Sequence, residues 1–431
     1  MLDYRFIAEN LEAVKKNIAD RYMKADAEAV ARLFARRTEL STGLQALQQQ
    51  RNANAAAMKG KMDAPERAAL VDEGKKLKES IAAAEADLAD TEAALLKEGR
   101  KIPNMAHPDA PIGREDKDNL EVKRVGTLAV FDFVPKDHVK LGQDLDIIDF
   151  DSATKVSGVK FYYLKNEGVF LELALLRYAL DILQKKGFTP FITPDLAKEE
   201  ILEGIGFNPR GDESNVYTVE GEGTCLVGTA EITLGGYYSN TILAKDKLPL
   251  RMAGLSHCFR REAGAAGQFS KGLYRVHQFT KLEMFVICLP EESGAFHDEL
   301  RAVEEEIFSG LEIPYRVVDT CTGDLGAPAY RKWDLEAWMP GRANPPSKDG
   351  GEWGEVTSTS NCTDYQARRL NIKYKDDEGK NKFVHMLNGT AIAVSRAIIA
   401  ILENFQESDG SVRIPKALVP YCGFECIMKR S

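Results

Sequence analysis

Arginines, an aromatic ring and carboxylates are concentrated in residues 251–288. A strand-like run ends in Arg260-Arg261-Glu262, a loop rich in glycine and alanine follows, and a second run, YRVHQFTKLEMFVIC, begins at Tyr274. Alternate residues of a strand share a face, so the second run is predicted to expose one polar set and to turn its other side to the core. The polar set is Arg275, His277, Phe279, Lys281 and Glu283, and the core-facing set is Val276, Leu282 and Met284.

This predicted hairpin suits an anionic, planar ligand such as a nucleotide. Arg260 and Glu262 share a face on the first run, as the polar set does on the second. Arginine forks bind phosphates, and the ring of Phe279 could stack on a base. The alternative is a solvated outer sheet face that carries cross-strand salt bridges. This segment alone leaves both interpretations open.

A single arginine interrupts an apolar stretch near the C-terminus. After Asn388-Gly389-Thr390, the segment AIAVSRAIIAILENF is predicted to be a helix, and Arg396 lies in its first half. The neighbours of Arg396 at helical spacing are apolar, and a buried guanidinium is costly unless it is paired. Either a carboxylate of the protein pairs with Arg396, or the arginine binds an anionic ligand such as a phosphate.

Two shorter elements could also contact a ligand. Gly228-Thr229-Ala230-Glu231 offers a hydroxyl and a carboxylate, although Thr229 would ordinarily serve as a helix N-cap. Residues 355–361, EVTSTSN, offer a carboxylate and hydroxyls that could hold Mg²⁺ together with phosphates. Taken alone, this second element could equally be the polar end of a strand.

The elements that must position these residues follow a long helical segment. Residues 25–101 are rich in Ala, Leu, Gln, Lys and Glu, and their apolar residues recur at steps of three and four on both sides of a turn at 59–65. This pattern predicts an antiparallel coiled-coil hairpin about 50 Å long. Between Arg51 and Lys78 it carries seven basic and four acidic residues. Such an excess could bind a phosphate backbone, but a solvated helix face and a dimerisation rod remain alternatives.

The remaining composition limits the class of protein. We predict an N-terminal domain over 1–101, a linker rich in proline and charge over 102–124, and an α+β domain over 125–431. The net charge of −9 argues against nucleic-acid binding by the whole surface. The seven cysteines form no CxxC pair, which disfavours zinc and disulfides and favours a reducing compartment, the cytoplasm or an organelle matrix. No apolar run is long enough to span a bilayer, so no membrane partner is expected.

In order and spacing, these segments resemble the bacterial and organellar seryl-tRNA synthetases, a family of class II aminoacyl-tRNA synthetases. Residues 187–194 resemble motif 1, residues 259–283 motif 2, and residues 389–396 motif 3. The hairpin, the Thr229–Glu231 element and residues 355–369 complete the resemblance, which covers essentially the whole chain. It implies an α+β fold, in which the hairpin precedes a catalytic domain built on an antiparallel sheet flanked by helices.

The resemblance also implies roles for individual residues. Arg260, Arg396 and Glu355 correspond to the catalytic residues, and Glu355 and Ser358 to ligands of the Mg²⁺ that accompanies ATP, with no zinc. The serine-binding positions correspond to Thr229, Ala230, Glu231, Arg260, Glu283, Asn388 and Thr390. The ATP-binding positions correspond to Arg260, Arg261, Glu262, Arg275, Val276, Phe279, Glu355, Val356, Thr357, Ser358 and Arg396.

The implied activity is serine–tRNA ligation, with ATP, L-serine and tRNA as partners. The arm would bind serine tRNA and, where an organism has one, selenocysteine tRNA. Motif 1 would form a homodimer around Pro194. Two alternatives are a catalytically inactive paralogue with a binding or regulatory role, and a ligase that loads a small amino acid onto a carrier protein. The sequence departs from the family at Val356-Thr357-Ser358-Thr359, where Ile-Ser-Ser-Cys is usual, and in a longer segment at 342–353.

Overall fold

The structure is a computed structural model, and it describes residues 1–208, 214–262, 272–344 and 346–430. The chain forms two compact units, Met1–Met105 and Ala106–Ser431. Within the described ranges, no helix combines the length and the apolar character needed to cross a bilayer.

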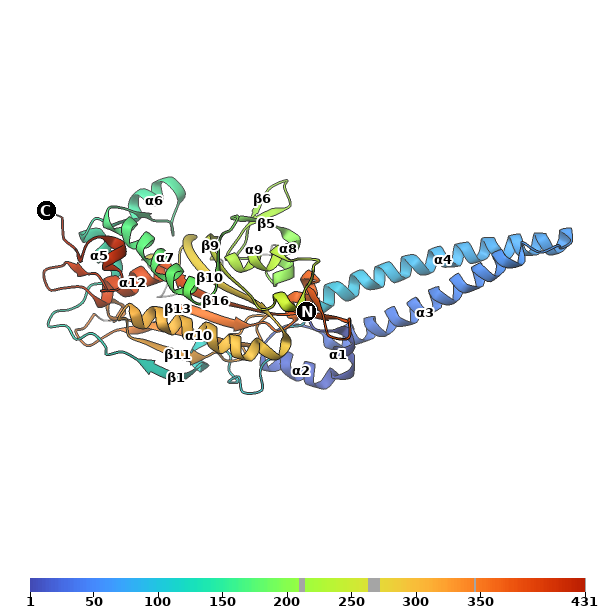
Figure 1. Cartoon of the computed structure of the whole chain (residues 1–431), viewed down its shortest axis with the longest axis horizontal. Helices are drawn as coiled ribbons and strands as arrows, with labels where there is room; N and C mark the ends of the chain where they lie inside the picture. The colour runs from blue at the N-terminus through green and yellow to red at the C-terminus, as the bar shows by residue number, and fades with distance from the viewer. Residues whose placement is uncertain (209–213, 263–271, 345, 431) are drawn as a thin grey trace. The chain divides into compact units, whose positions relative to one another are not determined.

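The first unit contains the predicted helical hairpin. Helices α1 (Tyr4–Glu9) and α2 (Leu11–Asp20) pack against the base of α3 (Ala27–Ala57), and α4 (Ala64–Gly99) returns antiparallel beside α3 (Figure 1). Asp26 caps α3, and Asp63 with Glu66 forms a capping box at the start of α4. The hairpin prediction is therefore confirmed.

The heptad positions form the seam between the two helices. Val30, Leu77, Ile81 and Leu95 are buried, as the apolar spacing predicts. A buried polar residue also lies in the seam, because Asn54 Nδ2 donates across the hairpin to the Leu70 carbonyl oxygen at 3.2 Å. Nearer the base of the arm, Arg37 Nε lies 3.0 Å from Glu92 Oε1 on the opposite helix.

The second unit is built on an eight-stranded sheet, which confirms the predicted α+β class. Its strand order is β1-β11-β12-β13-β16-β10-β9-β4. Every neighbouring pair is antiparallel except β4 with β9, which is parallel. The strands span Leu120–Val125 (β1), Tyr315–Asp319 (β11), Arg331–Met339 (β12), Glu352–Asn361 (β13), His385–Ala393 (β16), Gln278–Cys288 (β10), Leu250–Phe259 (β9) and Thr189–Ile192 (β4).

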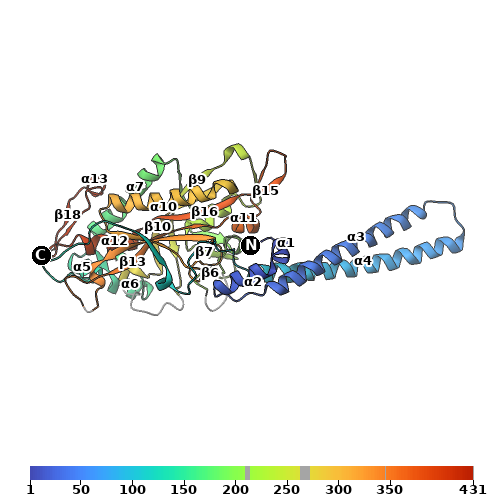
Figure 2. The same cartoon turned by 90° about the horizontal axis from the view of Figure 1, so that it is seen from below.

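Helices cover this sheet and enclose its core. Helices α7 (Glu167–Lys185) and α10 (Ser293–Gly310) run along one face (Figure 2), and the apolar helix α12 (Val394–Asn404) packs against β10, β12 and β13. A second apolar cluster lies between the sheet and α8 (Glu199–Ile205), α9 (Ala230–Tyr237) and α11 (Tyr365–Leu370). Both clusters surround the strands that carry the candidate site.

Short elements complete the second unit. The helices are α5 (His138–Asp144), α6 (Phe150–Ser157) and α13 (Val419–Cys422). The strands of the smaller sheets are β2 (Ile148–Asp149), β3 (Tyr163–Leu164), β5 (Leu196–Lys198), β6 (Tyr217–Val219), β7 (Thr224–Leu226), β8 (Ile242–Leu243), β14 (Lys373–Lys375), β15 (Asn381–Phe383), β17 (Val412–Arg413) and β18 (Cys426–Ile427).

Two predicted element boundaries are wrong. Residues 391–393 continue strand β16 against β10, so the helix begins at Val394 and Arg396 lies in its first turn. A short apolar run fits a buried strand as well as a helix, and periodicity alone does not separate them. Strand β10 begins at Gln278, so Arg275 and Val276 precede it in a connection and the predicted alternation applies only from Phe279 onward.

The segment predicted as a linker, 102–124, has regular structure at its end. Residues from 106 onward belong to the second unit, and β1 pairs with β11 at the edge of the sheet. All six residues of β1 are exposed or only half-buried, so the strand has no buried apolar face for a sequence pattern to reveal.

Candidate active site

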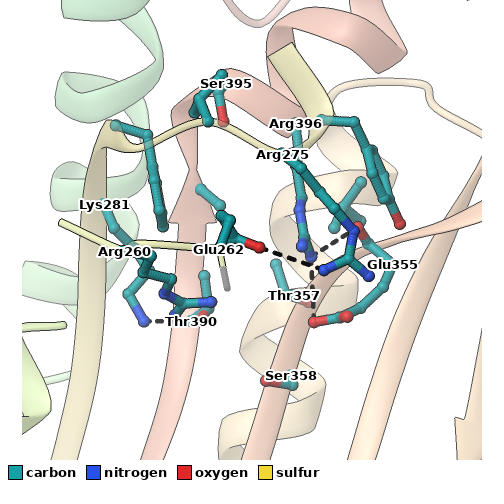
Figure 3. A pocket seen from close by; sticks show the side chains of 15 residues that line it. Arg260, Glu262, Arg275, Lys281, Glu355, Thr357, Ser358, Thr390, Ser395 and Arg396 are labelled. Atoms are coloured by element: carbon teal, nitrogen blue, oxygen red, sulfur yellow. Dashed lines mark hydrogen bonds and ion pairs between the residues drawn. The ribbon is translucent and has the colours of Figure 1, made fainter. Parts of the chain in front are cut away.

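A cavity of about 590 Å³, open to solvent, lies where β10, β13 and β16 meet the first turn of α12. Figure 3 shows Arg260, Arg275 and Arg396 around this cavity together with Glu262 and Glu355. Its lining residues are Arg260, Glu262, Tyr274, Arg275, Val276, Phe279, Lys281, Glu355, Val356, Thr357, Ser358, Thr390, Ala393, Ser395 and Arg396. Three separate chain segments thus bring their guanidinium groups to one cavity.

Arg396 forms an ion pair with Glu355, and both residues line the cavity. Its Nη1 atom lies 3.1 Å from Glu355 Oε1 and donates to the Glu355 carbonyl oxygen at 3.0 Å. Burial alone would raise the pKa of Glu355, but Arg396, Lys332 and Arg260 outweigh burial and lower it. Glu355 is therefore an anion at neutral pH. Of the two interpretations left open for Arg396, the protein carboxylate is present, and it lies beside a cavity that could hold an anion.

The other two arginines differ in their partners. Arg275 Nη1 lies 3.3 Å from Glu262 Oε2, and Glu262 has a φ of +48°, a conformation that side chains rarely adopt. Arg260 Nε lies 3.4 Å from the Gly228 carbonyl oxygen, and its guanidinium lies 5.4 Å from the ring centre of Phe279. Among the described residues, Arg260 has no carboxylate partner within 4.0 Å. It is the cavity arginine best placed to receive an anionic ligand.

A β-bulge brings Glu355 and Ser358 to the same face of the sheet. Residues three apart on a regular strand would face opposite sides. Here Glu355 pairs with Glu336 of β12, whereas Ser358 pairs with Asp334, two residues away on the same strand. The extra residue, Val356, is buried in the core. A carboxylate and a hydroxyl oxygen therefore point to one side, as two ligands of an Mg²⁺ ion would require.

A second group of polar residues adjoins the cavity through Lys281 and Thr390. Glu231 Oε1 accepts hydrogen bonds from Asn388 Nδ2 at 2.9 Å and from Gln366 Nε2 at 2.7 Å. Burial, and then the nearby Glu283, raise the pKa of Glu231 to about 7.

Glu283 holds the opposite side of this group. It accepts a hydrogen bond from Thr229 Oγ1 at 3.2 Å and forms an ion pair with Lys281. Lys281 Nζ also lies 3.5 Å from Thr390 Oγ1. Carboxylates, hydroxyls, amides and an ammonium group thus contact one another in a polar group next to the arginines.

Comparison with known proteins shows the family to which this chain belongs. Residues 1–106 match the model of the seryl-tRNA synthetase N-terminal domain, and residues 217–405 match the tRNA synthetase class II core domain (G, H, P, S and T). The chain is 71% identical to a serine–tRNA ligase of Treponema denticola, over 99% of this chain and 100% of that one. It is 59% identical over the full length of both chains to a serine–tRNA ligase of Treponema pallidum. The chain belongs to the seryl-tRNA synthetase family.

A solved structure from this family is similar over the whole chain. The seryl-tRNA synthetase of Pyrococcus horikoshii, solved in complex with ATP, has a TM-score of 0.92, with 40% identity and complete coverage of both chains. Membership in the seryl-tRNA synthetase family confirms the resemblance stated from the motifs.

The cavity includes most, but not all, of the site residues predicted from the seryl-tRNA synthetase motifs. Arg261 is not among the lining residues, and its backbone N–H donates to the Asn215 carbonyl oxygen at 2.9 Å. The other predicted residues outside the lining belong to the adjoining polar group and its surroundings: Thr229, Ala230, Glu231, Glu283 and Asn388. Ala230 is fully buried in the second apolar cluster.

Several residues of the site were not assigned a role from the sequence. Tyr274 and Ser395 line the cavity, and Gln366 contacts Glu231 from helix α11. The alternation along β10 places Lys281 on the same side as Phe279 and Glu283, so a signal for Lys281 was present in the sequence. Gln366 lacks such a signal, because its contact joins positions 135 residues apart.

Proposed function

We propose that this chain is a serine–tRNA ligase that activates L-serine with ATP and transfers it to tRNA. The convergence of Arg260, Arg275 and Arg396 from three segments onto one cavity carries the proposal. A triphosphate is the ligand whose charge matches three guanidinium groups, and arginine binds phosphate oxygens in a bidentate manner. Phe279 lies in the same cavity and offers a face to the adenine base.

The first step would join serine to the α-phosphate. A serine carboxylate oxygen attacks the α-phosphorus, the bond to the β-phosphate breaks, and pyrophosphate leaves. Arg260 would bind the α-phosphate and the reacting carboxylate, while Arg396 would bind the γ-phosphate. No nucleophile from the protein is needed, since positioning and charge compensation lower the barrier.

The second step would transfer the seryl group. The terminal ribose 3′-hydroxyl of tRNA attacks the acyl carbon, the bond to the phosphate breaks, and AMP leaves. When Mg²⁺ is bound with ATP, it compensates negative charge at the phosphates. Glu355 and Ser358 would hold it, because the bulge at Val356 turns both oxygens to one face.

The polar group beside the arginines suits the amino acid. Glu231 Oε2 and the Thr229 hydroxyl would bind the ammonium group of serine. Glu283, Asn388 and Thr390 would surround its hydroxyl. Alanine and glycine would leave these buried polar groups unpaired, and such a site rejects ligands that lack a hydroxyl strongly.

The function is tested by serine-dependent ATP–pyrophosphate exchange. We expect Arg260→Ala to reduce exchange by at least about 100-fold, the usual effect of removing a group that compensates transition-state charge. The matched control is Arg251→Ala, because Arg251 lies on β9, the strand that ends directly before Arg260, but pairs with Glu299 at 2.9 Å and is absent from the cavity lining. Near-normal exchange by the Arg260 variant would contradict the proposal. A wild-type chain that binds tRNA but shows no exchange would point to an inactive paralogue.

A further inference from the structure

A buried histidine–glutamate pair lies next to the cavity without lining it. His138 is the first residue of α5, and Glu403 lies near the end of α12. His138 Nδ1 is 2.8 Å from Glu403 Oε1, and the two side chains are 7% and 0% exposed. Both residues line a neighbouring cavity of about 900 Å³, which shares Tyr274 with the candidate active site. No residue of this pair belongs to the motifs considered so far.

The Glu403 carboxylate accepts three hydrogen bonds from two segments of the chain. Oε1 accepts from the His138 backbone N–H at 3.0 Å as well as from its ring, and Oε2 accepts from the Gly341 N–H at 3.0 Å. The second ring nitrogen of His138 accepts from the Leu273 N–H at 3.2 Å. Because Nε2 is an acceptor, the proton of the neutral ring is on Nδ1 and is donated to Glu403.

Two glycines let the backbone approach this pair closely. Gly272 has a φ of +62°, and a Cβ atom there would lie 2.2 Å from His138 Nε2. A Cβ atom on Gly341 would lie 2.9 Å from the carboxyl carbon of Glu403. Both contacts would be too short for a Cβ atom. Only glycine therefore lets each of these two segments pack this closely against the pair.

The segments held in this way carry groups of the triphosphate cavity. Leu273 directly precedes Tyr274 in a short 3₁₀ helix (Gly272–Tyr274), and Gly341 directly precedes Arg342. Two guanidinium groups pack on the Tyr274 ring. The guanidinium carbon of Arg342 lies 4.0 Å from the ring centre, and that of Arg396 lies 4.7 Å from it. Arg396 is seven residues before Glu403, which is about two turns along the same side of α12. One carboxylate therefore links three segments that meet at Tyr274.

We propose that His138 and Glu403 are positioning residues for triphosphate binding. Through Leu273 and Gly341 they hold Tyr274, and Arg275 next to it, against Arg396. The pair itself does not touch the ligand. This inference rests on the proposed function, because it assigns the pair to the ATP half of that site.

Two substitutions separate the two hydrogen bonds of the ring. Asn at position 138 keeps a donor at the δ position for Glu403 but removes the acceptor for the Leu273 N–H. Gln reaches the ε position and keeps that acceptor, while the donor to Glu403 is lost. We expect His138→Asn to raise the KM for ATP in pyrophosphate exchange by about 10-fold, the effect of losing one buried hydrogen bond. The KM for serine should change by less than about twofold, since serine contacts other segments.

The outcome for His138→Gln completes the test. This variant should lower Tm but keep the KM for ATP closer to the wild-type value, because the bond to Leu273 is retained. The matched control is His385→Asn. Among the described residues, the half-buried His385 makes one side-chain hydrogen bond, to Ser293 Oγ at 2.8 Å, and it lines neither cavity.

Three results would contradict either the positioning role of His138 and Glu403 or the proposed function. Equal losses of Tm in His138→Asn and His385→Asn with no change in the KM for ATP would show that the pair is only structural. Equal increases in the KM for ATP and for serine would also overturn the positioning role. A wild-type chain without exchange activity would instead overturn the proposed function.

Discussion

The ion pair between Arg396 and Glu355 leaves N–H donors of Arg396 available for a ligand. Arg396 uses Nη1 for both the Glu355 carboxylate and the Glu355 carbonyl oxygen. A guanidinium has five N–H donors in a planar fork, so Arg396 can keep Glu355 and still bind a phosphate through its other nitrogens. The ion pair therefore orients Arg396 before a ligand arrives and lowers the pKa of the carboxyl proposed to hold Mg²⁺. This partly exposed salt bridge is therefore compatible with ligand binding.

The sequence predicted those site residues that lie close to one another along the chain. Phe279, Lys281 and Glu283 alternate on one strand, and their common face follows from the strand period alone. The contact between Arg396 and Glu355 joins positions 41 residues apart, and no local period predicts it. The His138–Glu403 pair spans 265 residues and left no trace in the sequence for the same reason.

The raised pKa of Glu231 makes a prediction about serine affinity. If the Glu231 carboxylate binds the serine ammonium group, only the deprotonated form of the free enzyme binds serine well. The pKa of Glu231 is about 7, because burial and Glu283 disfavour its charged form. We therefore expect the KM for serine to rise about 10-fold as the pH falls from about 8 to about 6, while the KM for ATP changes much less. Pyrophosphate exchange measured across this range checks the expectation.

Glu231→Gln provides the control for this pH dependence. The amide cannot titrate, so the variant should bind serine weakly at every pH and show no slope near pH 7. The idea fails if the variant keeps the wild-type slope, because another group would then be responsible.

At the scale of elements, local irregularities place Arg396 and the two oxygens proposed to hold Mg²⁺. The bulge in β13 turns Glu355 and Ser358 to one face, and the late start of α12 puts Arg396 in its first turn. Neither follows from periodicity, since the bulge adds one residue to a strand and residues 391–393 are apolar in either conformation. The long helices of the arm were predictable, because their heptads extend over many turns.

The edge of the sheet makes a prediction about assembly. Strand β4 lies at the edge, in the segment that resembles motif 1, and its Ile192 is 87% exposed. Helix α7, which packs against β4, exposes Phe170 and Leu173. Exposed apolar surface on an edge strand favours a protein partner, and we propose that a second copy of this chain covers it around Pro194. We expect Ile192→Asp to convert a dimer to a monomer in light-scattering measurements at micromolar concentration.

Val130→Asp is the matched control for this test. Val130 is 86% exposed on a connecting segment outside the sheet, so its substitution should leave the mass unchanged. An identical dimeric mass for both variants, or a monomeric wild-type chain, would contradict dimerisation through this edge.

At the scale of the whole chain, features that depend on contacts between residues close in sequence could be predicted, and features that depend on distant contacts could not. The two-part organisation could be predicted, because composition changes sharply after the helical hairpin. The complete sheet order β1-β11-β12-β13-β16-β10-β9-β4 could not, since the pairs β1–β11, β13–β16, β16–β10 and β9–β4 join strands that are not consecutive in sequence. That order is nevertheless what makes β16 the strand between β13 and β10, so that Glu355 and Lys281 face one cavity. The chemistry of the second unit therefore depends on long-range pairing, whereas the arm depends on local pattern.

The arm can be tested separately, because it folds within the first unit. Arg37 and Glu92 lie 3.0 Å apart, so replacing residues 38–91 with a short glycine turn joins chain ends that are already side by side. We expect this variant to keep pyrophosphate exchange within about twofold, since the cavity lies wholly within the second unit. Charging of tRNA should fall by at least about 100-fold in kcat/KM, because the basic residues between Arg51 and Lys78 are proposed to bind its phosphates. Substituting Lys59 and Lys61 with Gln should flatten the salt dependence of tRNA binding without touching exchange. Normal charging by the shortened chain would exclude the arm from tRNA binding, and parallel loss of exchange would show that the deletion disturbs the second unit instead.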